Sequence, residues 1–202
     1  MTRQKVLLRH VESGGVVDAD LIDRIDLVIA KRAEDGWQTY LATARAEALA
    51  AKRPFPDLEH DHWEWERKVS ITHRLLPYPT LGIECEGQVQ GLMLLETDGH
   101  FARIATQAGS PVVYVNLLAT APWNLPAVTD PPRYRGVGTV LLAAATTLSV
   151  DLGFKGRLGL HSLPRSEDWY ERLGLTNLGS DSNKQNLKYY ELTPDQAQNL
   201  IR

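Results

Sequence analysis

Apolar residues recur along the chain with two different spacings, which predict helices in the first quarter and mainly strands further on. From Asp20 they recur at helical spacing, Glu34-Asp35-Gly36 is expected to interrupt the helix, and a second helix from Trp37 ends before Pro54. From Thr80 short apolar runs alternate with glycine turns, as strands do. After these two helices, and a first strand over 5–11, the expected order is strands over 80–85, 89–97 and 111–120, a helix over 138–152, a strand over 156–161, a helix over 166–173, a strand over 187–192 and a terminal helix capped by Thr193.

This order predicts an α+β fold, that is, a mixed α/β architecture with one mixed sheet. The three strands between 80 and 120 are expected to form an antiparallel meander. With 202 residues, 43% of them hydrophobic, the chain can bury one sizeable core, so we expect a single domain over residues 1–202.

Charge and cysteine content exclude several classes of protein. The 22 Lys and Arg residues against 25 Asp and Glu leave a formal net charge of -3, which gives no field for attracting nucleic acid. The single cysteine, Cys85, excludes an internal disulfide framework and a cysteine zinc site, and we interpret it as a buried apolar side chain rather than a nucleophile. No window approaches the ~20 apolar residues of a membrane span, so we expect a soluble, cytoplasmic protein.

The segment Arg133-Tyr134-Arg135-Gly136-Val137-Gly138 is a glycine turn that leads into an apolar helix. Such a turn presents free backbone N–H groups to an anion, and its two glycines remove the Cβ atoms that would keep a phosphate away. Neither a P-loop nor a dinucleotide fingerprint fits, because Thr139 and Val140 follow the last glycine and position 141 is leucine. The alternative is an ordinary turn with two solvated arginines.

Two short motifs in this half of the chain resemble those of the GNAT superfamily. Arg133-x-x-Gly136-x-Gly138 matches its pattern Arg/Gln-x-x-Gly-x-Gly/Ala, and Tyr170-Glu171-Arg172-Leu173-Gly174-Leu175 is similar to its Tyr-Glu-x-Leu-Gly-Phe. The resemblance is specific over roughly residues 80–192. It implies an acyl-CoA N-acyltransferase fold with a mostly antiparallel sheet of about six to seven strands flanked by helices.

The resemblance also implies an activity and a set of coenzyme contacts. An acyl-CoA, most often acetyl-CoA, would donate its acyl group to a primary amine by direct attack. Tyr170 falls on the position of a general acid for the departing thiolate, although it could also be a core aromatic. One amide on the strand before the turn would polarise the thioester carbonyl. The implied coenzyme-binding residues are Leu118, Thr120, Arg133, Arg135, Gly136, Val137, Gly138 and Thr139.

The chain departs from the GNAT pattern in two places. Residues 122–132 form a long, proline-rich connection where the superfamily has only a few residues. In the superfamily, an Asn commonly follows the strand that corresponds to residues 156–161, near the start of the next helix. Here His161, Ser162 and Ser166 stand in that region instead.

Residues 57–71 combine five acidic residues with two His and two Trp in a stretch that we expect to be helical. A metal site using His62 and Glu66 would need a third converging ligand, so we expect no metal. Acidic and aromatic groups attract an ammonium, and an attacking amine must lose a proton. Glu64 or His62 is therefore a candidate base, with Glu84 as a competitor.

The leading function is N-acetyltransferase activity towards a small-molecule or peptide amine. One alternative is a non-catalytic, GNAT-like sensor or interaction module that binds coenzyme A. Another is a binding protein whose acidic and aromatic segment docks a basic partner. The acceptor, the base, the acyl-chain preference and homodimer formation stay open.

Overall fold

The computed structural model describes residues 2–201, which gather into two compact units. Unit 1 comprises Met1–Met93 and Leu118–Leu141, and unit 2 comprises Leu94–Leu117 and Leu142–Arg202. The predicted single domain over residues 1–202 stays a prediction. The predicted mixed α/β architecture is confirmed, with strands in the order β6-β1-β2-β3-β4-β5-β7-β9-β8. The sheet has nine strands, so the expected six to seven is wrong.

Unit 1 begins with a hairpin of β1 (Thr2–His10) and β2 (Val16–Asp23), paired antiparallel along its whole length. The helix expected from Asp20 is therefore wrong in its first part. β2 also pairs with β3 (Thr80–Cys85), which buries Ile22 completely. Pairing on both edges overrides the helical spacing of the apolar residues.

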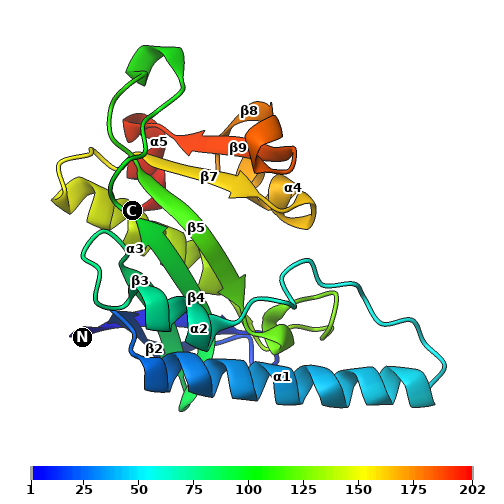
Figure 1. Ribbon diagram of the computed structural model, residues 1–202. Helices are drawn as coiled ribbons and strands as arrows, with labels where there is room; N and C mark the ends of the chain where they lie inside the picture. Colours follow the sequence, from blue (N-terminus) through cyan, green and yellow to red (C-terminus); the bar gives the residue numbers. More distant parts are fainter. Residues whose placement is uncertain (1, 202) are drawn as a thin grey trace. The chain divides into compact units, whose positions relative to one another are not determined.

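The rest of that expected helix and the second helix expected from Trp37 form one continuous helix, α1 (Leu27–Ala50). Asp26 caps its start by accepting a hydrogen bond from the Ile29 amide at 2.9 Å. Gly36 lies inside the helix without interrupting it. α1 runs along one side of unit 1 in Figure 1, and its buried face consists of Ile29, Ala30, Ala33, Trp37, Leu41 and Ala48. α2 (Trp65–Thr72) is shorter than the helix expected over 57–71, because residues 57–64 are not helical and contain a turn at 59–62.

The strands expected next are confirmed as β4 (Gln88–Glu96) and β5 (Val113–Thr120). After a 3-10 turn at Pro122–Asn124, the proline-rich connection reaches β6 (Tyr134–Arg135), which pairs with β1. Asn124 anchors β6 by accepting a hydrogen bond from the Tyr134 amide at 2.9 Å. The two-residue β6 leads directly into α3 (Val137–Asp151).

In unit 2, β7 (Leu158–Ser162) lies parallel to β5 and antiparallel to β9 (Leu187–Leu192). α4 (Glu167–Arg172) confirms the expected helix, and an exposed strand, β8 (Thr176–Asp181), pairs with β9. α5 (Pro194–Leu200) begins with a capping box on Thr193, as expected. Within residues 2–201, no helix combines the length and apolar character needed to cross a membrane.

Candidate functional site

The start of α3 is an open helix N-terminus in unit 1. Gly136 precedes it with a φ of +96°, a left-handed value that favours glycine, and a Cβ there would meet no atom within 4 Å. The first bond of helical spacing runs from the Val140 amide to the Gly136 carbonyl at 2.9 Å. The amides of Val137, Gly138 and Thr139 precede that bond, so this turn can offer N–H groups and partial positive charge to an anion.

A glycine on β4 fixes where this helix starts. A Cβ at Gly91 would lie 2.6 Å from the Val137 side chain and 3.2 Å from the Ala119 carbonyl oxygen. The first turn of α3 can therefore lie directly against the sheet, with Val137 only 2% exposed. The helix N-terminus is held by packing beside the last residues of β5.

Two arginines face each other next to this turn. Arg9 on β1 and Arg135 on β6 are direct partners in the antiparallel register, and both are exposed. Among residues 2–201, neither forms an ion pair or a side-chain hydrogen bond. Like charges directly opposite each other repel, and a bound anion would relieve that repulsion. Sequence reasoning missed Arg9, because only the pairing of β1 with β6 brings it to Arg135.

Arg133 lies in a different environment from Arg135. Its guanidinium donates a hydrogen bond to Gln88 Oε1 at 2.7 Å and lies 5.5 Å from the centre of the Trp123 ring. Arg133 also lines a groove of about 880 Å³ along α1, whose walls include Trp37. Its contact with a phosphate stays a prediction.

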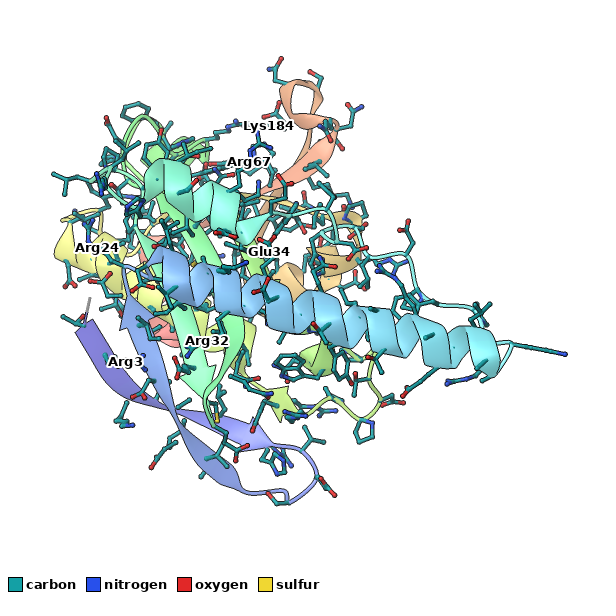
Figure 2. The ribbon with its side chains drawn as sticks, turned by 60° about the horizontal axis from the view of Figure 1, so that its bottom comes forward. Arg3, Arg24, Arg32, Glu34, Arg67 and Lys184 are labelled. Atoms are coloured by element: carbon teal, nitrogen blue, oxygen red, sulfur yellow. The ribbon has the colours of Figure 1, made fainter. Side chains whose placement is uncertain are left out.

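The carboxylates predicted as bases both have cationic partners. Glu84, with a side chain 15% exposed, pairs with Arg32 at 2.7 Å and Arg3 at 3.3 Å, and these two arginines are labelled in Figure 2. Glu64 precedes α2, is 60% exposed and pairs with Arg67 at 3.0 Å. Their catalytic roles stay predictions. In the part of the chain that the structure describes, no three His, Cys, Asp or Glu side chains could hold a metal together.

In unit 2, the ladder between β5 and β7 is short. It joins Val113 to Leu158, Tyr114 to Gly159 and Val115 to Leu160. Val115 and Leu160 are the last of these pairs. The predicted pantetheine contacts, Leu118 and Thr120, lie further along β5, in unit 1.

A hydrogen-bonded chain crosses from β5 to β7 where the ladder ends. The Tyr114 hydroxyl lies 2.8 Å from His161 Nδ1, and His161 Nε2 lies 3.1 Å from Asp181 Oδ2. Arg103 donates to the same Asp181 oxygen at 2.7 Å and, with His161, holds the pKa of that carboxyl at about 2. Burial lowers the pKa of His161 and raises that of Tyr114 to about 12. A neutral His161 thus donates to Asp181 and accepts from Tyr114.

A second polar group, centred on Glu96, adjoins this chain. The Asn116 side-chain amide donates to Glu96 Oε1 at 2.5 Å, and His100 Nε2 lies 2.7 Å from Glu96 Oε2. The His100 ring stacks on Tyr114 with centres 4.3 Å apart. No short motif marks these residues, since they come from different segments of the chain, and sequence reasoning missed them.

Comparison with solved structures identifies the architecture. The GNAT domain of PAT from S. lividans aligns over 94% of this chain and 96% of its own, with 16% identity and a TM-score of 0.55. The chain has the GNAT fold. FeeM, an N-acyl amino acid synthase from uncultured soil microbes, aligns over 89% of this chain and 95% of its own, with 14% identity and a TM-score of 0.52. No protein-family model and no curated protein sequence matches the chain.

Within this GNAT fold, the predicted coenzyme contacts all belong to unit 1, whereas Tyr170 belongs to unit 2. Tyr170 lies in α4 with only 7% exposure, and its ring contacts Trp169 and Tyr190 at centre distances of 4.8 and 5.9 Å. Burial raises its pKa, so its hydroxyl keeps the proton that a general acid needs. Its catalytic role stays a prediction.

Proposed function

We propose that the protein transfers an acyl group from an acyl-CoA, acetyl-CoA in the simplest case, to a primary amine. The N-terminus of α3 carries this proposal, since a Cβ at Gly136 would meet only open space, and Arg9 and Arg135, which have no side-chain partner among residues 2–201, lie beside it. The GNAT fold supports it as well, and one structure with this fold is an N-acyl amino acid synthase.

The residues of unit 1 suit the diphosphate of coenzyme A. The amides of Val137, Gly138 and Thr139 would donate to its oxygens, and Arg9 and Arg135 would add mobile positive charge. Arg133 is proposed as a further phosphate contact. Coenzyme A would supply the acyl group as an activated thioester.

The remaining proposed roles concern the end of β5 in unit 1 and α4 in unit 2. The backbone of Leu118 and Thr120 would bind the pantetheine arm, and one amide there would polarise the thioester carbonyl. Tyr170 would donate a proton or a hydrogen bond to the departing thiolate, because burial keeps it protonated. Glu64 and Glu84 remain proposed bases, and the acceptor is a small-molecule or peptide amine.

The proposal is tested by titrating coenzyme A calorimetrically and measuring the release of free thiol from acetyl-CoA with a panel of primary amines. Gly136→Ala should weaken binding at least tenfold, the equivalent of about 1.4 kcal/mol, because a methyl group and a changed turn disturb the first amides of α3. Gly153→Ala is the matched control. Gly153 also has a positive φ, of +77°, with open space for a Cβ, but lies after the other end of α3.

Each outcome has a separate meaning. Coenzyme binding with amine-dependent thiol release supports the proposed transfer. Binding without release for any amine in the panel favours the non-catalytic module. If wild type does not bind coenzyme A, or if Gly136→Ala and Gly153→Ala weaken binding equally, the proposed site is wrong.

A further inference from the structure

Glu96, at the end of β4, is the anionic centre of a preformed polar site in unit 2. Its side chain is 20% exposed, so it is shielded but still reachable. Asn116 and His100 each occupy one of its oxygens, at 2.5 and 2.7 Å. These two contacts fix the carboxylate in one orientation while leaving further lone pairs on both oxygens.

The site lies where the β5–β7 ladder ends. Asn116 follows Val115, the last residue of β5 in the ladder, and His161 follows Leu160, its partner on β7. Tyr114 and Asn116 lie on the same face of β5, because side chains alternate along a strand. The hydrogen bond from Tyr114 to His161 spans the two strands on that face, and Glu96 is held there by Asn116.

Glu96 differs from the other shielded carboxylates of unit 2 in its partners. Asp181 pairs with Arg103 at 2.7 Å and Glu167 pairs with Lys188 at 2.5 Å. Glu191 is fully buried and accepts hydrogen bonds from two backbone amides and from Gln107. Among residues 2–201, no lysine or arginine pairs with Glu96. An additional cation is therefore the partner that this site can accept.

We propose that Glu96, in place of Glu64 and Glu84, binds the ammonium group of the acceptor and takes its proton, an inference that rests on the proposed acyl transfer. One N–H bond of the ammonium breaks, its proton becomes the O–H of the Glu96 carboxylic acid, and the nitrogen keeps the electron pair. That pair then attacks the thioester carbonyl. As the C–S bond breaks, its electrons leave with the sulfur, and the second proton of the nitrogen passes to this thiolate, so that the products are the N-acyl amide and the free thiol. Glu96 returns its proton to solvent.

His161 and Tyr114 are positioning residues in this site. Both His161 nitrogens are already bonded, and its side chain is 5% exposed, so it cannot readily receive an incoming amine. It holds the Tyr114 hydroxyl, and the Tyr114 ring supports His100, which in turn orients Glu96.

The charged groups around this site select among amines. Lys184, on the turn between β8 and β9 and labelled in Figure 2, has its Nζ 5.9 Å from the centre of the Tyr114 ring. It favours an acceptor that carries an anionic group besides its ammonium. The titratable and charged side chains within this network are His100, Arg103, Tyr114, His161, Asp181 and Lys184.

The test compares wild type with Glu96→Gln, which keeps the shape of the side chain and removes its charge. With 1,4-diaminobutane and glycylglycine as acceptors, Glu96→Gln should lower kcat/KM by about 100-fold or more and flatten the rise of kcat/KM with pH. Glu167→Gln, which removes a shielded carboxylate of the same unit from its ion pair, should leave both unchanged. Loss of turnover in Glu64→Gln or Glu84→Gln, with an active Glu96→Gln, would overturn the inference.

A binding measurement keeps the inference falsifiable without turnover. The ring signals of His100, assigned in an NMR spectrum with His100→Asn, should shift when 1,4-diaminobutane or glycylglycine is added to wild type, but not to Glu96→Gln. Lys184→Gln should weaken the binding of glycylglycine but not that of 1,4-diaminobutane, since 1,4-diaminobutane has no anionic group. An unchanged His100 signal with both amines overturns the inference.

The two proposals fail in different ways. A His100 shift that depends on Glu96, in a protein that neither binds coenzyme A nor releases thiol, supports the ammonium site and refutes the proposed transfer. Thiol release that is unaffected by Glu96→Gln supports the transfer and refutes the role of Glu96. Circular dichroism of each variant confirms that the fold is retained.

Discussion

Individual carboxylates in unit 2 serve different purposes according to their neighbours. Glu191 is completely buried and binds the backbone amides of Arg103 and Ile104, the latter at 3.1 Å. It therefore anchors the connection between β4 and β5, which also carries His100. Glu96, by contrast, is partly exposed and, among residues 2–201, is oriented by the side chains of Asn116 and His100.

Glu191→Gln should lower the free energy of unfolding by about 2 kcal/mol, because the new NH₂ group replaces one of the two oxygens and cannot accept the hydrogen bond that the Arg103 or the Ile104 amide donates to it. Urea denaturation followed by tryptophan fluorescence measures this loss. Backbone amides at 103 and 104 should also exchange hydrogen faster. Unchanged stability and exchange would show that Glu191 does not hold this connection.

Asp181 predicts a pH dependence of stability. Its pKa falls from 3.8 to about 2 in the folded protein, mainly because Arg103 and His161 donate hydrogen bonds to it. Its contribution is therefore complete above the unfolded pKa of 3.8 and is lost as pH falls towards 2. As pH falls from 3.8 to about 2, the free energy of unfolding of Asp181→Asn should therefore decrease less than that of wild type. Parallel curves of urea midpoint against pH would contradict this.

Single functional residues were predictable from the sequence only where neighbours in the chain define them. Gly136 and Tyr170 stand inside short motifs, so spacing alone nominated them. Arg9 reaches Arg135 only through strand pairing, and Glu96 reaches Asn116 only through folding of the meander. Such long-range neighbours leave no periodic signal in the sequence.

The position of α3 depends on Gly91. Gly91→Val should displace the first turn of α3, because a Cβ would lie 2.6 Å from Val137 and 3.1 Å from Leu141. We expect about 2 kcal/mol of destabilisation and weaker coenzyme binding. Thermal unfolding and calorimetry measure the two effects. If Gly91→Val is destabilised but binds coenzyme A normally, the packing of this turn against β4 is not needed for coenzyme binding.

Gly36 should be a site where α1 can be stabilised. It is exposed inside the helix, and a Cβ there would meet nothing within 4 Å. Gly36→Ala should therefore raise the free energy of unfolding by about 1 kcal/mol, since alanine restricts the unfolded chain. Urea denaturation checks this. A loss of stability would show that the helix needs glycine at this position.

Elements were predictable where local pattern and tertiary pairing agree. Strands β3, β4, β5 and β9 and helices α3 and α5 appear close to their expected places. At residues 20–29 the apolar spacing runs across a strand end and a helix start, so it imitated one helix. β8 is almost entirely exposed and β6 has two residues, so neither carries a recognisable apolar pattern.

For the molecule as a whole, the sequence motifs and the solved structures agree on the fold. Two motifs predicted the GNAT fold, and solved structures with TM-scores of 0.55 and 0.52 confirm it at identities of 16% and 14%. At such identities a shared fold does not determine the substrate. The proposed activity therefore depends on the chemistry of its own residues, above all on the N-terminus of α3.

The most direct test of that chemistry is calorimetric binding of dephospho-coenzyme A and of pantetheine, which lacks the diphosphate and the nucleoside. Wild type should bind dephospho-coenzyme A at least 100-fold more tightly than pantetheine, about 2.7 kcal/mol. Gly136→Ala should lose most of this difference. Equal affinity of wild type for the two ligands, or an undiminished difference in Gly136→Ala, would contradict diphosphate binding at α3.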